Sequence, residues 1–274
     1  MKKIIALIKP NAPLIYFVDQ INRKHSIHTV IIEDKNLGRL SLLNKIKRSV
    51  ALDSRAPVNP QVLAKIKSRE LAELYTTIFG EGWLDIDASM KILYCKNISD
   101  PEVEEFLGRE KPDLLLDHGT SIVKNRIIEN APLALNLYWG LSPYYRGTHC
   151  TEWALINWDP RNIGVTIHRL AKKIDGGDVL CQAQVEPEPH DTVESINMKL
   201  SREGTRILIQ ALALWVNDQK LQYFKQDHSA GYLTLNRQWS RELRQVIKNI
   251  EADRGIARML DKPARREYLP IVEI

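Results

Sequence analysis

The sequence has few cysteines and no long apolar run. Its 274 residues include three cysteines, which form no CxxC pair and lie at Cys95, Cys150 and Cys181. This usage is typical of a reduced, intracellular protein and gives no support to a disulfide framework or a cysteine-based zinc site, so no metal is predicted. No segment approaches the roughly 18 apolar residues that span a membrane, so we expect a cytoplasmic protein without a membrane partner.

The common phosphate-binding motifs are absent as well. The segment KPNAP at residues 9–13, after the first predicted strand, lacks GxGxxG, and GxxxxGK[ST] occurs nowhere. An ordinary NAD-binding or P-loop interpretation therefore has little support. The apolar run at residues 4–8 is too short for a signal peptide. The formal charge of +5 suits an anionic ligand, such as a nucleotide sugar or RNA, but selects neither.

What the sequence does have is a regular alternation of apolar strands and amphipathic helices. Strands are predicted at residues 3–8, 29–32, 91–95, 113–117, 133–138, 164–168 and 179–185. Helices are predicted at residues 14–23, 101–108 and 152–158, and from near residue 191. This alternation predicts an α/β fold, Rossmann-like, with a mainly parallel sheet and helices on both faces.

The last of these helices has two further signals. Asp191 and Glu194 have the spacing of a capping box, which predicts the start of the helix. Apolar residues then recur at helical spacing, which predicts a stripe of core residues at Ile196, Leu200, Leu208, Leu212 and Trp215.

Two segments depart from the alternation. Residues 37–88 are rich in helix signals and poor in strand signals, so we interpret them as a helical insertion in a domain that spans residues 1–217. Residues 218–274 are predicted to form a small C-terminal appendage with a short strand at 232–235. A basic amphipathic helix follows that strand, with Leu243, Val246, Ile247 and Ile250 on one face.

Two strings carry the chemistry, NLYWGLSPYYRG at residues 136–147 and DGGD at residues 175–178. Asn136 ends an apolar strand, and its amide could donate to an oxyanion without burying a charge. Asp175 could position a cation or accept a proton. Open α/β sheets place their sites at such strand ends. Each residue alone is explained as well by a turn, and the two strings together favour a site.

The two strings resemble those of the folate-dependent formyltransferases, the family of the sugar-nucleotide, methionyl-tRNA and glycinamide ribonucleotide formyltransferases. In that family a strand ends in Asn, one residue and His, and a loop continues through Pro to Arg-Gly; here Tyr138 stands at the histidine position. Residues 164–180 are similar to the family's strand, acidic loop and strand, and residues 111–124 to its pterin-binding loop. The resemblance covers residues 90–212 well and 1–35 loosely.

The resemblance implies an enzyme that transfers a formyl group from 10-formyltetrahydrofolate to the amine of a small molecule, with an amino-sugar nucleotide as the first expectation. It implies that Asn136 stabilises the oxyanion and that Asp175 assists proton transfer. Tyr138 has an ordinary pKa of about 10, against about 6.5 for histidine, so it is expected to donate a hydrogen bond rather than to act as a base. The folate is expected at His118, Gly119, Thr120, Ser121 and Ile122, and the substrate at Tyr144, Arg146 and His149.

Alternatives stay open for several of these residues. Arg146 is explained equally well by a structural ion pair. Packing under the loop is the favoured role of Tyr144 and Tyr145, and a solvent-facing helix start is slightly favoured for His149. For His118, and for His168 at the end of another predicted strand, structural and functional roles are equally supported.

At the level of function, Tyr138 supports a second hypothesis, a folate-fold binding protein that has lost catalysis. A third is a tRNA-binding formyltransferase, on the basic tail of Arg241, Arg244, Lys248, Arg254, Arg258, Arg265 and Arg266. A solvated helix face explains that tail at least as well, so no nucleic-acid partner is predicted. A homodimer is an open alternative.

Overall fold

The computed structural model describes residues 2–35, 69–80, 90–172, 175–262 and 269–274. Its internal contacts divide the chain into two units. The first comprises Met1–Asn136 with Leu170–Lys172, and the second comprises Leu137–Arg169 with Lys173–Ile274. Each unit is described by itself.

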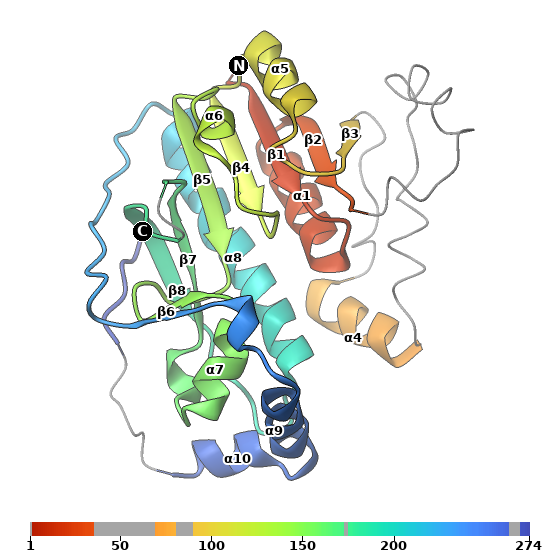
Figure 1. The fold of residues 1–274 in the computed structure, drawn as a ribbon, viewed down its shortest axis with the longest axis vertical. Helices are drawn as coiled ribbons and strands as arrows, with labels where there is room; N and C mark the ends of the chain where they lie inside the picture. Colours follow the sequence, from red (N-terminus) through yellow and green to blue (C-terminus); the bar gives the residue numbers. More distant parts are fainter. Residues whose placement is uncertain (1, 36–68, 81–89, 173–174, 263–268) are drawn as a thin grey trace. The chain divides into compact units, whose positions relative to one another are not determined.

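The first unit is built on parallel strands (Figure 1). They are β1 (Ile4–Ile8), β2 (Ile27–Glu33), β3 (Lys91–Cys95), β4 (Leu114–His118) and β5 (Leu133–Tyr138), in the order β3-β2-β1-β4-β5. The register places Asp117 of β4 beside Asn136 of β5, and Ile8 beside His118. The carboxyl ends of these parallel strands therefore bring polar residues to one edge, as the sequence predicted.

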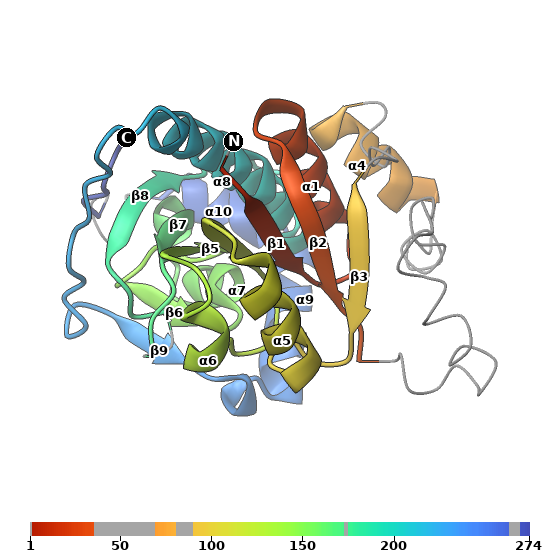
Figure 2. The same ribbon diagram turned by 90° about the horizontal axis from the view of Figure 1, so that it is seen from above.

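Helices cover both faces of this sheet. The helices on the sheet are α1 (Ala12–Lys24), α5 (Pro101–Glu110) and α6 (Asn125–Ile128), whereas α4 (Arg69–Phe79) packs on α1, where the Phe79 ring stacks on Tyr16 at a centroid distance of 4.1 Å. Figure 2 shows α1 on one face of β1 and β2 and α5 on the other. Helix α1 begins where the side chain of Asn11 accepts a hydrogen bond from the Leu14 N–H at 3.1 Å, with Pro13 in its first turn. The KPNAP segment, which lacks a nucleotide-binding motif, thus starts a helix.

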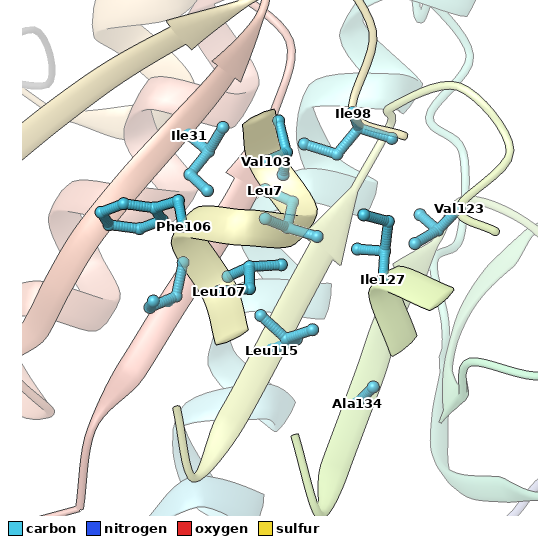
Figure 3. Packing of buried hydrophobic residues seen from close by; sticks show 11 residues of the cluster. Leu7, Ile31, Ile98, Val103, Phe106, Leu107, Leu115, Val123, Ile127 and Ala134 are labelled. Atoms are coloured by element: carbon cyan, nitrogen blue, oxygen red, sulfur yellow. The ribbon is translucent and has the colours of Figure 1, made fainter. Parts of the chain in front are cut away.

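A compact apolar cluster fixes α5 and α6 to the sheet. Val103, Phe106 and Leu107 of α5 lie over Leu7, Ile31 and Leu115 of the strands (Figure 3). Each such side chain contributes about 1.5–3 kcal/mol on full burial, because its apolar surface leaves water. The cluster holds the strands from which the polar loops of this unit emerge.

The second unit contains an antiparallel strand pair and a minor parallel pair. Strands β7 (Gly164–Arg169) and β8 (Val179–Gln184) are antiparallel, and β6 (Tyr145–Gly147) is parallel to β9 (Tyr232–Thr234). Figure 2 shows β6 and β9 side by side. The helical elements are α7 (Cys150–Ile156), η1 (Pro160–Asn162), α8 (Val193–Val216), η2 (Asn236–Gln238), α9 (Arg241–Ala252) and α10 (Gly255–Leu260).

The predicted fold class is confirmed. The main sheet has seven strands in the order β3-β2-β1-β4-β5-β7-β8, and only the pairing of β7 with β8 is antiparallel among the pairings described here. In the part of the chain that the structure describes, no helix is long and apolar enough to cross a membrane.

The cap of α8 differs from the prediction by one residue. The N-cap is Thr192, whose side chain accepts from the Ser195 N–H at 3.1 Å, while the Ser195 hydroxyl accepts from the Thr192 N–H at 2.9 Å. Asp191 lies outside the helix and accepts from the Ser195 hydroxyl at 2.7 Å. Of the predicted stripe, Ile196, Leu200, Leu208 and Leu212 are fully buried, whereas Trp215 in the last turn is half-buried.

Two described stretches of the predicted appendage, near Phe224 and near Val272, are hydrogen-bonded to β8 of the same unit. Phe224 forms an antiparallel bridge with Val179 at the start of β8, and Gln182 N–H donates to the Val272 carbonyl at 2.6 Å. The predicted boundary at residue 217 stays a prediction. In the basic helix α9, Ile247 is buried and Val246 is exposed. The predicted insertion at 37–88 lies outside the described residues except for the stretch 69–80, which contains α4.

Candidate functional site

Tyr138 is the last residue of β5, and its hydroxyl already has partners. The oxygen lies 3.2 Å from the Gly147 carbonyl oxygen, to which it donates, and 2.7 Å from the Cys150 sulfur. Burial raises the pKa of Tyr138 well above its ordinary value, and Cys150 and Asp175 add to the rise. Burial also raises the pKa of the Cys150 thiol to about 12. Both groups therefore stay protonated near neutral pH, and neither is a base.

Asp175 stands in a tight turn in the same unit. Its backbone φ is 46°, the left-handed region that non-glycine residues rarely adopt. Its Oδ2 accepts a hydrogen bond from the Gly147 N–H at 3.0 Å. Burial raises the pKa of this carboxyl, while His168, the Gly147 N–H and Arg146 oppose the rise. A carboxylate whose charged form is disfavoured by burial is suited to accept a proton.

His168 is buried near the end of β7, with 2% of its surface exposed. Its Nδ1 lies 2.8 Å from the Arg169 carbonyl oxygen, which can only accept, so Nδ1 carries a hydrogen and Nε2 is the basic nitrogen of the neutral ring. Burial lowers the pKa of His168, although Asp175 and the Arg169 carbonyl oppose this. The imidazole lies edge-on to the Tyr138 ring at a centroid distance of 6.0 Å. The second unit thus brings together a phenol, a carboxyl and a neutral imidazole.

Position 147, whose backbone is hydrogen-bonded to Tyr138 and Asp175, requires a glycine. Its φ of 99° lies in the left-handed region, and a Cβ at this position would overlap the Thr234 carbonyl oxygen of β9. The Thr148 N–H donates to that same oxygen at 2.9 Å, and the Thr234 hydroxyl donates to the Thr148 carbonyl at 2.7 Å. Only glycine lets β6 approach β9 this closely while presenting its own N–H to Asp175.

Arg146, Tyr145 and Tyr144 make hydrogen bonds within the second unit. Arg146 is 4% exposed, and its Nη1 and Nη2 donate to Nδ1 and the carbonyl oxygen of His228 at 2.9 and 3.1 Å. The Tyr145 hydroxyl donates to a buried Asp159 oxygen at 2.7 Å, which is a packing role. Tyr144 is half-buried, and its carbonyl accepts from the Tyr232 N–H at 2.8 Å. Substrate contacts of Tyr144 and Arg146 stay predictions.

His149 is the N-cap of α7, with φ of 61°. Its Nδ1 lies 3.0 Å from Glu152 Oε1, and its ring stacks on Trp239 at a centroid distance of 4.4 Å. The side chain is therefore partly covered rather than simply solvent-facing. A flat aromatic pair at this place could take part in a nucleobase contact, and the substrate role of His149 stays a prediction.

The loop after β4 in the first unit contains the residues predicted to hold folate. His118 is buried beneath it, edge-on to Phe17 at a centroid distance of 5.1 Å. The Thr120 hydroxyl donates to Asp117 Oδ1 at 2.5 Å, and Gly119 has φ of 72°. Ile122, by contrast, is 69% exposed.

A buried carboxylate fixes this loop from below. Glu33 ends β2 and is 1% exposed. Its Oε2 accepts from the Ser121 N–H at 2.8 Å, and its Oε1 accepts from the Ile98 N–H at 3.1 Å. The backbone of the predicted folate loop is thus tied to the loop after β3. Asn136 of the neighbouring strand β5 is 8% exposed.

Comparison with known proteins decides the family. The family model described as formyl transferase matches residues 54–212, more than half of the chain. The chain belongs to the formyl transferase family.

Two curated relatives illustrate the match. The bifunctional polymyxin resistance protein ArnA of Wigglesworthia glossinidia brevipalpis is 34% identical over 125 residues, which cover 45% of this chain and 19% of the relative. The methionyl-tRNA formyltransferase of Desulforamulus reducens is 32% identical over 130 residues, which cover 46% of this chain and 40% of the relative. The chain spans less than half the length of either relative.

Among solved structures, the fold of this chain is similar to that of the N-formyltransferase from Helicobacter canadensis, solved in complex with folinic acid and dTDP-3-aminofucose. The TM-score is 0.57 at 14% identity, and the alignment covers 88% of this chain and 73% of that one. At this identity the likeness concerns the fold alone.

Three residues near the predicted site were not predicted from the sequence. Trp239 lies under His149, Glu33 fixes the loop after β4, and Gln226 donates from its side-chain amide to the Asp175 carbonyl at 3.0 Å. Glu33 had a signal, because a carboxylate ends an otherwise apolar strand. Gln226 and Trp239 lie in polar segments with no motif, so only the folded chain reveals them.

Proposed function

We propose that the chain transfers a formyl group from 10-formyltetrahydrofolate to an amine, and that the amine belongs to an amino-sugar nucleotide. The observation that carries the proposal is the grouping of partly buried Asp175 and Tyr138 and buried His168 around the Gly147 backbone. Family membership supports the reaction class. The Helicobacter canadensis complex with folinic acid and dTDP-3-aminofucose supports the choice of donor and acceptor.

The reaction needs a proton acceptor and an oxyanion donor. The acceptor nitrogen forms a bond to the formyl carbon, the tetrahedral intermediate then loses its bond to N10 of the folate, and one proton passes from the amine to N10. We assign proton transfer to Asp175, with His168 tuning its charge. The side-chain amide of Asn136 is assigned to the oxyanion. Asn136 precedes Tyr138 by two positions in β5.

In this proposal Tyr138 is a hydrogen-bond donor and not a base. Its raised pKa keeps the hydroxyl protonated, and its partners are Gly147 and Cys150. The residue would orient the Gly147 peptide, whose N–H donates to Asp175. The proton-accepting role of the family histidine would thus fall to Asp175.

For the donor, we assign the loop after β4. Exposed Ile122 offers an apolar surface for the pterin, and the backbone of Gly119–Ser121 offers polar groups held in place by Glu33. His118 is buried, so it would support the loop from below rather than touch the ligand.

The test is calorimetric titration of the purified chain with folinic acid, followed by mass spectrometry of a panel of amino-sugar nucleotides incubated with 10-formyltetrahydrofolate. Saturable binding and an acceptor that gains one formyl group would support the proposal. Asp178→Asn, in the same turn as Asp175, is the matched control and should retain activity. Folded protein that does not bind folinic acid would rule out the folate assignment.

A folate-binding protein without turnover is the second candidate, and Tyr138 favours it. Its hydroxyl is already hydrogen-bonded, and it supplies no base. If the parent binds folinic acid without turnover, and Tyr138→His gains turnover, this second candidate replaces the first.

A further inference from the structure

We propose that Gln226 is a positioning residue that fixes the turn of Asp175, and that the 224–234 segment thereby completes the active site. The inference rests on the proposed function, because it treats Asp175 as the group that moves the proton. Nothing in the sequence around Gln226 marks it, and the placement follows from its contacts alone.

The turn of Asp175 needs an external support. Asp175 has φ of 46°, a conformation disfavoured for residues with a Cβ because the side chain approaches the following carbonyl. Such a conformation persists where neighbouring groups specify it. The direction of the carboxyl depends on this backbone, since Oδ2 must reach the Gly147 N–H at 3.0 Å.

Gln226 supplies that support with one amide group. Its Nε2 donates to the Asp175 carbonyl at 3.0 Å and to the Gly177 carbonyl at 2.6 Å. Both partners can only accept, so the orientation of the amide is determined by its hydrogen bonds. Two bonds from one planar group to carbonyls two residues apart fix the direction of both peptides, and hence the direction of the Asp175 side chain.

The 224–234 segment is anchored on both sides of Gln226. Upstream, Phe224 and Val179 exchange backbone hydrogen bonds of 2.8 Å in both directions. Downstream, His228 holds the Arg146 guanidinium, and the Tyr232 N–H donates to the Tyr144 carbonyl at 2.8 Å. The segment therefore contacts both loops that the Gly147–Asp175 hydrogen bond joins.

Nearby groups also change the pKa of Asp175. The groups that act on the Asp175 carboxyl are His168, Arg146 and the Gly147 N–H, and Tyr138 and Cys150 lie near enough for Asp175 to raise their pKa values. Gln226 adds no charge to this set. A carboxylate in its place would face two carbonyl oxygens and add a second negative charge near Asp175, which would raise the pKa of Asp175 further.

The experiment compares Gln226→Met and Gln226→Glu with the parent. Gln226→Met keeps the length of the side chain without its donors, and Gln226→Glu replaces donors by acceptors. Gln222→Met is the matched control, because Gln222 lies in the same polar stretch and is exposed. Steady-state kinetics across pH, calorimetry with folinic acid, and NMR hydrogen exchange of the Gly147, Gly177 and α8 amides are measured for each.

We expect Gln226→Met to lower kcat by about 10- to 100-fold, since small displacements of a reacting group cost rates of that order, with an unchanged Kd for folinic acid. Exchange of the Gly147 amide should rise by about tenfold, with α8 amides as in the parent. Gln226→Glu should also move the acid limb of the kcat profile to higher pH, which a packing role would not do.

Each result decides a separate point. Parent-like kcat and parent-like exchange at Gly147 in Gln226→Met would overturn the inference. A uniform rise in exchange that includes α8 would also overturn it, because it would show general destabilisation. Selective exchange at Gly147 in a chain whose parent has no turnover would retain the positioning role and reject the proposed function.

Discussion

In both the loop after β4 and the turn of Asp175, a carboxylate accepts hydrogen bonds from backbone N–H groups. The surroundings of the two carboxylates differ. In the first, buried Glu33 accepts backbone N–H groups on both oxygens, from Ile98 and Ser121. In the second, Asp175 accepts the Gly147 N–H, but its pKa is raised by burial and its neighbour is a neutral histidine.

The difference concerns two carboxylates, one that holds loops together and one to which we assign proton transfer. Glu33 sits at the end of a regular strand, and its hydrogen bonds join two loops of ordinary backbone. Asp175 sits in a left-handed turn held by other groups, in surroundings that disfavour its charge. We therefore expect substitutions at Glu33 to change stability and donor binding, and substitutions at Asp175 to change turnover.

The largest expected effect is on the rate. Asp175→Asn keeps the shape of the side chain and removes its proton-accepting charge, so kcat should fall by about 10²- to 10⁴-fold with donor binding retained. Steady-state kinetics and calorimetry with folinic acid measure both quantities. A Glu33→Gln variant that lost as much kcat at saturating donor would break the comparison.

Next in size is a matched pair of glycines, one in each region. Gly147→Ala should cost at least about 2 kcal/mol in unfolding free energy, because its Cβ would meet the Thr234 backbone and φ is positive. Gly119→Ala also has positive φ, but its Cβ would lie 3.1 Å from a Leu14 methyl group, which can move. About 1 kcal/mol is expected there. Urea unfolding compares the two, and equal losses would contradict the assigned difference.

A smaller effect is expected at Glu33 itself. Glu33→Gln places an NH₂ group against one of the two N–H donors, so unfolding should become easier by about 1–3 kcal/mol. Binding of folinic acid should weaken, since the Ser121 backbone loses its support. Denaturation and calorimetry test the two parts. Unaltered stability together with unaltered binding would show that Glu33 does not hold this loop.

The smallest effect concerns pH. The pKa of His168 is lowered in the folded chain, so below the ordinary histidine pKa the unfolded chain binds a proton that the folded chain does not. Stability should therefore fall as the pH drops from 7 toward the folded value. The raised pKa of Asp175 acts in the opposite sense as its carboxyl takes up a proton. His168→Gln should flatten the decline between pH 7 and 5.5 in urea titrations, and Glu33→Gln, the control, should not.

Much of the fold could be predicted because the pattern of apolar residues within each strand or helix indicates that element. Strand and helix periodicities located the sheet of the first unit, and the observed β1 and β5 agree with their predicted ranges to within one residue. Short elements such as α6 and α10 were missed, since four to six residues carry too little periodicity. The cap of α8 was placed one residue early because Ser195, and not Glu194, reaches back to Thr192.

The site was predictable only where it has a motif. The strings around Asn136, Tyr138 and Asp175 were found in this way, and their roles stay proposals. β6 was not predicted, because three residues become a strand only when β9 pairs with them. Gln226 is 51 residues from Asp175, and Glu33 is 88 from Ser121. Such partners are specified by the tertiary fold.

The parallel pairing of β6 with β9 has a consequence for the order in which the protein is made. Every strand on which the first unit is built has been synthesised once Tyr138 is added, and N-terminal parts fold first during translation. Tyr145–Gly147 pair with Tyr232–Thr234, so the loop at Gly147 must wait for a stretch of chain translated much later. A chain stalled on the ribosome before Gln226 would therefore contain an Asp175 turn that lacks its support.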